Sequence, residues 1–243
     1  MRIALVSPYD LSVPGGVQSQ IVGLSEALVR LGHDLCVVGP GRTGSWGIPG
    51  AESVAVGSSL PIPANGSLAP ITPWPLAMRR SVRALTRFSP QVVHVHEPLV
   101  PGPALASLIS AEAPVVATFH RARPSRTYSA YARPLRRVVH RATELVAVSD
   151  AAAETARRVL GEVDLTIVAN AVDSERFERL HPSRRSSPTA LFVGRIERRK
   201  GLEVLLAAFH GLAGDFSLRV VGDGPEAAQL KRRFGSDNRI VFL

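Results

Sequence analysis

The sequence has one cysteine, few aromatic side chains and no long apolar run. Cys36 alone cannot form an internal disulfide or a zinc cluster, which is typical of a reducing compartment and predicts a cytoplasmic protein. Aromatic residues make up 5% of the chain and are not interleaved with its basic segments, so we expect no nucleic-acid partner. No stretch reaches the roughly 18 uncharged apolar residues of a membrane span, and the opening apolar run is too short for a signal peptide.

The signatures of several common chemistries are also missing. The chain contains no G-x-x-x-x-G-K-[ST] phosphate loop, no G-x-S-x-G nucleophile turn, no H-E-x-x-H zinc motif and no Asp-x-Asp pair for a metal-bound nucleotide. The dinucleotide fingerprint G-x-G-x-x-G is not met at Gly15 and Gly16, the turn after the first expected strand, which argues against NAD.

Positive charge is abundant, because 29 Lys and Arg residues face 20 Asp and Glu residues and leave a net charge of +9. All but two of the cations are arginine, the exceptions being Lys200 and Lys231. Such a field attracts phosphate in nucleic acid, anionic lipid or a phosphorylated metabolite. The alternative is that the excess of arginine reflects a compositional bias and has no function.

Short apolar, β-branched runs alternate with segments of helical period along the first two thirds of the chain. Strands are expected at 3–6, 35–38, 92–96, 115–119, 145–148 and 165–169. Helices are expected at 17–31, 76–88, after Pro103, at 131–141 and, capped by Asp150, at 151–160. Residues 39–75 are rich in Gly, Pro and Ser and are predicted to be a surface excursion with one weak strand at 53–56. The pattern predicts a doubly wound α/β domain over 1–172.

A polar, basic linker is expected at 173–188, after which the strand and helix pattern restarts over 189–243. This second α/β segment has three expected strands, half the usual complement, and its last strand has no successor to cover it. We therefore expect a complete first Rossmann-like domain and the first half of a second one, with the chain cut short.

Two turns between a strand and a helix are suited to phosphate. Gly15 and Gly16 let backbone N–H groups approach a phosphate at a helix N-terminus, although a tight turn without a ligand explains them equally well. Arg195 and Lys200 lie in the corresponding turn of the second segment, where their charges can stabilise a diphosphate leaving group. A solvated basic loop is the alternative for that turn.

Histidines mark the ends of two expected strands. His120 can hydrogen-bond a sugar hydroxyl or a phosphate, or it can be an ordinary satisfied polar residue. His94 and His96 share one face of their strand and Glu97 follows, which superficially suggests a metal site. Because no third and fourth ligand is evident, we do not expect a metal there.

Arginines recur at every fourth residue in two expected helices, at 79, 83 and 87 and again at 133, 137 and 141. Such helices can lie on the inner face of an anionic membrane as a peripheral contact. An ordinary amphipathic surface helix is the alternative, and the sequence favours it.

These residues together resemble the family-4 retaining glycosyltransferases of GT-B fold, and most closely the phosphatidylinositol mannosyltransferases. The resemblance covers the whole chain in order. It is carried by Met1-Arg2-Ile3, Pro14-Gly15-Gly16-Val17-Gln18, Leu31-Gly32-His33, His94-Val95-His96-Glu97-Pro98, Thr118-Phe119-His120, Val148-Ser149-Asp150, Gly194-Arg195, Lys200-Gly201 and Gly222-Asp223-Gly224.

The resemblance implies transfer of a sugar from a nucleotide diphosphate donor, GDP-mannose in the nearest relatives, with retained configuration and without an essential metal or other cofactor. It makes Arg195 and Lys200 the residues that neutralise the diphosphate, and His120 the contact to the reacting sugar. The donor is also expected to contact Gly15, Gly16, Gly222 and Gly224. The acceptor, a lipid or polyol phosphate, is expected to contact Tyr9, Gln18 and Arg121.

Departures from the family pattern bear on activity and acceptor. The Glu-x7-Glu motif for the donor sugar and ribose is absent, as is the terminal helix that crosses back to the first domain, so we expect the 243-residue chain itself to be inactive. Leu99 and Arg121 stand where the inositol-lipid enzymes carry Asn and Thr, and Ala171 replaces a usual glycine. A catalytically silent protein that binds nucleotide sugars or a membrane is the alternative function.

Overall fold

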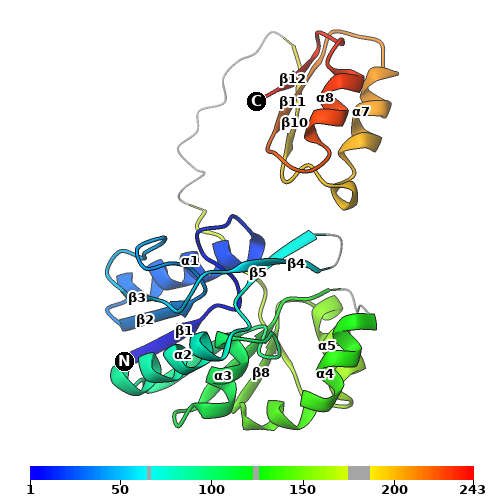
Figure 1. Cartoon of the computed structure of the whole chain (residues 1–243). Coiled ribbons are helices and arrows are strands. Elements are labelled where there is room, and N and C mark those ends of the chain that lie inside the picture. The colour runs from blue at the N-terminus through cyan, green and yellow to red at the C-terminus, as the bar shows by residue number, and fades with distance from the viewer. Residues whose placement is uncertain (65–66, 123–125, 175–186) are drawn as a thin grey trace. The chain divides into compact units, whose positions relative to one another are not determined.

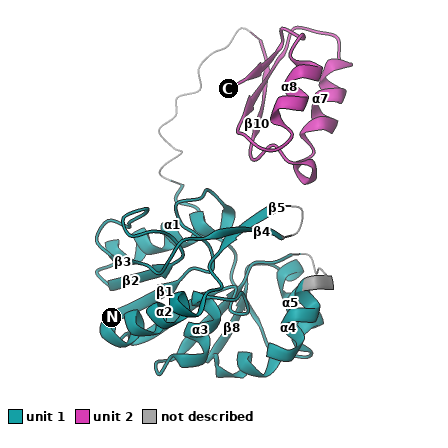
Figure 2. Cartoon of the chain, in the orientation of Figure 1, with its two compact units in different colours: residues 1–174 teal, residues 175–243 magenta. Residues whose placement is uncertain are grey.

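The computed structural model describes residues 1–64, 67–122, 126–174 and 187–243, and it divides the chain into two compact units, residues 1–174 and 175–243 (Figure 2). The predicted linker at 173–188 lies mostly outside the described residues.

Unit 1 contains a seven-stranded sheet in the order β3-β2-β1-β6-β7-β8-β9, with every neighbouring pair parallel (Figure 1). Its strands are β1 (Arg2–Val6), β2 (Asp34–Gly39), β3 (Glu52–Ala55), β6 (Val92–His96), β7 (Val115–Phe119), β8 (Glu144–Ala147) and β9 (Thr166–Ile167). The strand order reverses between β1 and β6, and open α/β sheets bind ligands at the carboxyl ends of the strands at such a reversal.

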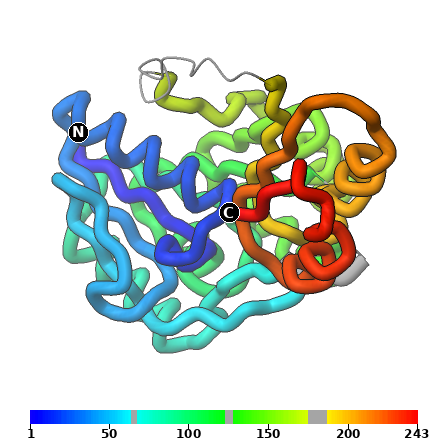
Figure 3. The backbone as a smooth tube through the Cα atoms, turned by 90° about the horizontal axis from the view of Figure 1, so that it is seen from above, coloured from blue at the N-terminus to red at the C-terminus, as the bar shows by residue number. Residues whose placement is uncertain are grey.

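Helices cover both faces of this sheet (Figure 1). They are α1 (Gly16–Arg30), α2 (Pro75–Phe88), α3 (Pro103–Ser110), α4 (Arg126–Leu135), a 3₁₀ helix (Arg136–Arg141) and α5 (Asp150–Leu160). The path through β1, α1 and β2 can be followed in blue in Figure 3. Alternate residues of β1 face opposite sides, so Ala4 and Val6 pack with α2 and α3 while Leu5 packs with Ile21 of α1. Because both faces are covered, the strand is apolar at successive positions.

Unit 2 is a parallel three-stranded sheet in the order β10-β11-β12, with strands β10 (Thr189–Val193), β11 (Ser217–Val221) and β12 (Ile240–Phe242). A 3₁₀ turn (Arg198–Lys200), α7 (Leu202–His210) and α8 (Ala227–Phe234) connect them. Leu206, Leu218 and Leu230 form the centre of its core. Within the described part of the chain, β12 pairs only with β11. The α/β fold class with parallel sheets is confirmed.

The prediction for residues 39–75 was wrong in part, because this stretch contains more structure than one weak strand. An antiparallel hairpin of β4 (Leu60–Ala64) and β5 (Ser67–Ile71) follows β3. Val56, Ile71 and Thr72 are buried, so the segment is anchored to the unit and does not simply run over its surface. Proline at positions 61, 63 and 70 hid the strands, and proline is tolerated in a hairpin of only two strands, both of which are edges.

The expected helix at 131–141 was wrong in part, because only residues 131–135 are α-helical. The α-helix ends at Leu135, one residue after Pro134, and continues as 3₁₀. Proline lacks the N–H that the ladder needs, and a 3₁₀ helix has three residues per turn. Arg133, Arg137 and Arg141 are exposed, but their spacing does not align them on one α-helical face.

The cap of α5 differs from the prediction by one position. Ser149, not Asp150, is the N-cap, and its hydroxyl accepts a hydrogen bond from the backbone N–H of Ala152 at 3.2 Å. Asp150 is the first helical residue, where its negative charge still favours the positive end of the helix dipole.

Candidate active site

The candidate site of unit 1 lies where β1, β6 and β7 end. Tyr9 follows β1, Glu97 follows β6, and His120 and Arg121 follow β7. Because β1 and β6 are neighbours at the reversal of strand order and β6 pairs with β7, these loops meet at one edge of the sheet.

Three histidines are packed together at this edge. His94 and His96, two residues apart on β6, stack with ring centroids 4.3 Å apart. Nε2 of His94 lies 2.7 Å from Oγ1 of Thr118, and Nδ1 of His96 lies 2.9 Å from Nε2 of His120. Burial lowers the pKa of His94 to about 4, and burial followed by the charge of His94 lowers the pKa of His120 to about 4. The rings are therefore neutral at neutral pH.

Glu97 joins the ends of β6 and β7. Its side chain is buried, and its backbone has a φ of 47°, a left-handed conformation that non-glycine residues seldom adopt. Its Oε1 accepts a hydrogen bond from the backbone N–H of His120 at 2.7 Å, and the carboxylate also accepts from the backbone of Arg121. Burial raises its pKa, whereas the charge of Arg121 and these two N–H groups act in the opposite direction. Glu97 thus holds the backbone of both predicted site residues.

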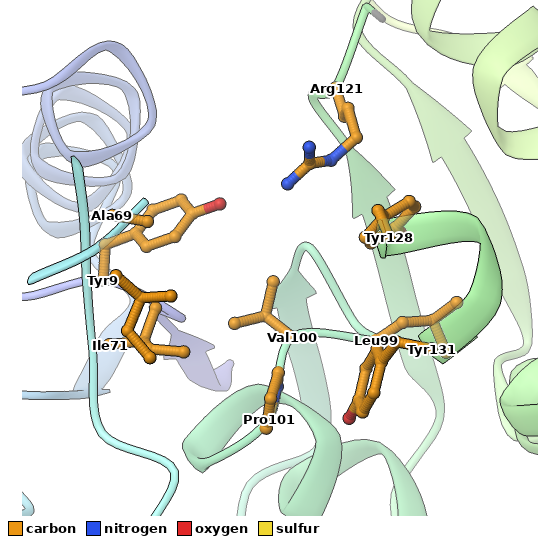
Figure 4. Close-up of a pocket in the computed structure, with 10 residues that line it drawn as sticks. Tyr9, Ala69, Ile71, Leu99, Val100, Pro101, Arg121, Tyr128 and Tyr131 are labelled. Carbon is orange, nitrogen blue, oxygen red and sulfur yellow. The ribbon is translucent and has the colours of Figure 1, made fainter. Parts of the chain in front are cut away.

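Arg121 lies between two tyrosines, as Figure 4 shows. Its guanidinium carbon is 4.3 Å from the ring centroid of Tyr128, and its side chain hydrogen-bonds Tyr9. Burial, with the nearby charge of Glu97 next in size, raises the pKa of Tyr9 above its usual value. The phenol therefore remains a protonated hydrogen-bond donor.

A pocket of about 100 Å³ opens beside this arginine. Apart from Tyr9 and Arg121, its walls are apolar side chains of the β4–β5 hairpin and of the loop after Glu97, with two tyrosines of α4 (Figure 4). They are Ile62, Ala69, Ile71, Leu99, Val100, Pro101, Tyr128 and Tyr131. A cation at the edge of an apolar pocket suits a ligand that joins an anionic group to an apolar one.

The two glycines, Gly15 and Gly16, lie at the start of α1. Gly15 is the N-cap, and a Cβ there would lie 2.3 Å from Oε1 of Gln18, so the side chain of Gln18 covers this position. Gln18 itself is 7% exposed, and most of its surface is therefore turned into the unit. A Cβ on Gly16 would meet no atom within 4 Å. Open space therefore borders the first helical turn, whose N–H groups lack intrahelical acceptors.

The predicted cations of unit 2 lie on the connection after β10. Arg195 is 38% exposed, and its Nε lies 3.8 Å from Oε2 of the buried Glu197. Glu197 is also paired with Arg199, whose Nη2 is 2.5 Å from Oε1. Lys200 is exposed at the end of the 3₁₀ turn and has no ion-pair partner among the described residues. Glu197 thus anchors two arginines, whereas Lys200 keeps its charge available.

The two predicted glycines of unit 2 have a packing role. A Cβ on Gly222 would lie 2.0 Å from the carbonyl oxygen of Gly194, and one on Gly224 would lie 2.3 Å from that of Ile196. The loops after β10 and β11 are thus in backbone contact, which only glycine permits at these positions. This requirement stands whether or not a ligand binds.

The structure therefore groups the predicted residues within each unit. Tyr9, His120 and Arg121 come together in unit 1, and Gly15 lies against the side chain of Gln18 at the start of α1. Arg195, Lys200, Gly222 and Gly224 belong to unit 2. In the described residues, no group of three or more His, Cys, Asp or Glu side chains is arranged to hold a metal ion.

Sequence reasoning missed the positioning roles of His96 and Glu97 and the apolar pocket. The His-x-His-Glu signal was visible but was weighed only as a metal site. The contact between His96 and His120 depends on sheet register, because His96 pairs with Thr118 of β7 and His120 follows Thr118 by two residues. The pocket walls come from segments far apart in the sequence.

The arginine-rich helix α2 packs as an ordinary surface helix. Ala77, Ser81, Ala84 and Leu85 face the core, whereas the arginines at 79, 83 and 87 are exposed. Among the described residues, no helix combines the length and apolar character required for a membrane span.

Comparison with known proteins shows the family and the fold of this chain. The family model "Glycosyltransferase Family 4" matches residues 14–176, and "Glycosyl transferases group 1" matches residues 173–238. The structure of HepE from Anabaena in complex with UDP-glucose aligns with a TM-score of 0.69 at 18% identity, over 99% of this chain and 68% of that one. Such a likeness shows the fold, which is that of the GT-B glycosyltransferases.

Two curated relatives are both named phosphatidyl-myo-inositol mannosyltransferase. The protein of Mycolicibacterium smegmatis is 37% identical over 234 residues, which cover 93% of this chain and 60% of that protein. The protein of Mycobacterium tuberculosis H37Rv is 36% identical over 243 residues, which cover 97% of this chain and 63% of that protein. The chain thus spans about three fifths of the length of these relatives. By its match over residues 14–176, this chain belongs to glycosyltransferase family 4.

Proposed function

We propose that this protein transfers mannose from GDP-mannose to a lipid or polyol-phosphate acceptor such as phosphatidylinositol, with retention of the anomeric configuration. The observation that carries the proposal is the convergence of Tyr9, Glu97, His120 and Arg121 at the carboxyl ends of β1, β6 and β7, in a chain of glycosyltransferase family 4. The names of the mycobacterial relatives support mannose and the inositol lipid.

In unit 2, Arg195 and Lys200 neutralise the diphosphate that leaves with the nucleotide. Both are cations on the connection after a parallel strand, and Lys200 has no ion-pair partner among the described residues that would compete for it. Gly222 and Gly224 keep the loops after β10 and β11 close to each other and so shape the surface of unit 2 that binds the nucleotide. Arginine and lysine thereby take the role that a metal ion has in other transferases, and the proposal assigns no metal.

In unit 1, His120 contacts the reacting sugar, and the first turn of α1 at Gly15 and Gly16 offers N–H groups to a phosphate. Arg121 and Tyr9 bind the acceptor. The guanidinium supplies a charge for its phosphate, and the phenol supplies a hydrogen-bond donor. Gln18 shapes the same turn through its contact with Gly15.

Nucleotide release by the full-length protein tests donor and acceptor together. The protein is incubated with GDP-mannose, UDP-glucose or ADP-glucose, each with and without phosphatidylinositol. We expect release of GDP that depends on the lipid. Preference for a UDP- or ADP-sugar would contradict GDP-mannose as the donor. Nucleotide release that does not depend on the lipid would contradict phosphatidylinositol as the acceptor. Saturable donor binding without nucleotide release would favour the catalytically silent binding protein.

Charge removal in unit 2 tests the leaving-group assignment. Arg195→Ala or Lys200→Ala should lower turnover by about 100-fold or more if each cation stabilises developing charge. Arg198→Ala is the matched control, because Arg198 is an exposed cation of the same 3₁₀ turn. Equal effects of all three variants would assign these residues to a general basic loop.

A further inference from the structure

His96 and His120 share one hydrogen bond between two strands, and the position of its proton decides what His120 can do. Nδ1 of His96 lies 2.9 Å from Nε2 of His120. Two unprotonated nitrogens at this distance would repel each other, and two protonated ones would clash, so one proton lies between them. Either His96 or His120 carries this proton.

Burial makes both rings neutral. His96 is 1% exposed, and burial followed by its histidine neighbours lowers its pKa well below the usual value. The pKa of His120 is lowered to about 4. The charged and titratable groups around the pair are His94, stacked on His96, and Glu97, which is bound to the backbone of His120. Each ring therefore carries one proton at neutral pH, on one of its two nitrogens.

Nε2, the second ring nitrogen of His96, decides whether His96 or His120 donates the hydrogen bond. Nε2 of His96 is fully buried, and no described residue hydrogen-bonds to it. If His96 carried its proton there, a buried N–H would have no acceptor, which folded proteins rarely tolerate. If the proton is on Nδ1 instead, only a lone pair is left without a partner, which costs less. With its proton on Nδ1, His96 donates the hydrogen bond to Nε2 of His120. With its proton on Nε2, His96 would instead accept the hydrogen bond from His120.

We propose that His96 is a positioning residue that donates its Nδ1 proton to Nε2 of His120 and so fixes His120 as the neutral tautomer protonated at Nδ1. His120 then presents an N–H at its second nitrogen. His120 is half-buried, and no described residue hydrogen-bonds to its Nδ1.

A consequence for the reaction rests on the proposed function. His120 contacts the sugar as a hydrogen-bond donor to an oxygen atom and not as a general base, because its single basic lone pair is already occupied by His96. A neutral donor can stabilise partial negative charge on that oxygen without taking up a proton. His96 thus acts on the substrate only through His120.

Nitrogen NMR reads the tautomer directly and needs neither donor nor turnover. The ligand-free protein, labelled with ¹⁵N in histidine, is examined at pH 7 by long-range ¹H–¹⁵N correlation, with the His120 signals assigned by comparison with His120→Gln. We expect His120 to be protonated at Nδ1 and unprotonated at Nε2. The reverse pattern, or a doubly protonated ring, would overturn the proposal even if the protein proves to be an active mannosyltransferase.

Two substitutions of His96 separate hydrogen bonding from packing. His96→Asn keeps an amide N–H near the position of Nδ1, whereas His96→Leu keeps bulk without a donor. We expect His120 to stay protonated at Nδ1 in the first variant and to gain the Nε2-protonated form in the second. An unchanged tautomer in folded His96→Leu would show that His96 does not set it.

Kinetics of the same variants give an independent reading once turnover is established. His96→Leu should lower kcat by about 10- to 100-fold with a smaller change in the KM for donor, and His96→Asn should recover most of that loss. A folded His96→Leu with wild-type kcat would contradict a role of the tautomer in catalysis. An inactive full-length wild-type protein would refute the proposed function but leave the NMR result valid.

Discussion

The carboxylate of Glu97 accepts a hydrogen bond from the backbone N–H of His120 at 2.7 Å, across neighbouring parallel strands. One buried side chain therefore fixes the start of the loop that carries both His120 and Arg121. The left-handed backbone of Glu97, with a φ of 47°, shows that the surrounding contacts offset the strain of this position.

Glu97→Gln should lower the free energy of unfolding by about 1 to 3 kcal/mol, because the amide accepts through one oxygen only and loses the attraction to Arg121. Urea denaturation monitored by tryptophan fluorescence measures the change, since both tryptophans, Trp46 and Trp74, lie in unit 1. Glu112→Gln, a change at an exposed carboxylate after α3, is the control and should leave stability unchanged. Equal stabilities of the two variants would argue against a stabilising role of the hydrogen bonds that Glu97 accepts.

The buried histidines predict a loss of stability in mild acid. The pKa values of His94 and His120 are about 4 in the folded chain against about 6.5 when unfolded, so the unfolded chain binds more protons between these values. Stability is then complete above pH 6.5 and falls as the pH drops toward 4, by up to about 1.4 kcal/mol per pH unit for each histidine.

Urea denaturation between pH 7 and pH 5 measures this slope before carboxylates contribute strongly. His94→Gln removes one titrating ring and should reduce the slope. His140→Gln, a change at an exposed histidine of the 3₁₀ helix, should leave it as it is. A flat profile in the unchanged protein would refute the prediction.

Gly16→Ala should impair transfer without harming the fold. The new methyl group meets no protein atom within 4 Å, so it projects only into the space assigned to a ligand. We expect kcat/KM to fall on the order of 10- to 100-fold, because small displacements of a bound substrate are costly. Gly23→Ala is the matched control in the same helix, also with nothing within 4 Å, and should retain full activity with slightly higher stability. Full activity of Gly16→Ala would remove Gly16 from the site.

Gly222→Ala should destabilise unit 2 itself. Its Cβ would lie 2.0 Å from the carbonyl oxygen of Gly194, and its φ of 135° is strained for any L side chain. The combined cost is about 2 to 5 kcal/mol. Hydrogen exchange of peptides from 187–243 measures it, since unit 2 has no tryptophan. Gly211→Ala, whose nearest neighbour atom would be 3.6 Å away, should exchange as the unchanged protein does.

Arg121→Ala should weaken binding of the acceptor and not of the donor. Loss of a charge-assisted hydrogen bond to an anionic headgroup should raise the acceptor KM by about 10-fold or more and leave the donor KM unchanged. Steady-state kinetics with each substrate varied in turn measure both constants. Arg133→Ala, at an exposed arginine of α4, controls for general charge. A larger effect on the donor than on the acceptor would move Arg121 to the other substrate.

The strand and helix pattern was readable because most elements are buried on a regular period. Ala4, Leu5 and Val6 have no exposed surface, and the apolar run that this requires is visible in the sequence. The hairpin β4–β5 and the end of α4 were not readable. Proline masked the strands in one case and changed the helix type in the other, and local patterns do not show how tertiary contacts compensate for a lost N–H.

The sequence by itself determined the fold class, the glycines and cations of the two turns, and the family resemblance, because these depend on local periodicity and on short motifs. Tertiary structure alone decided that His96 meets His120, that Glu97 holds the next loop, and that Gly222 touches Gly194. These pairs join separate strands and their loops, so their distances follow from strand order and register, which no short stretch of residues specifies.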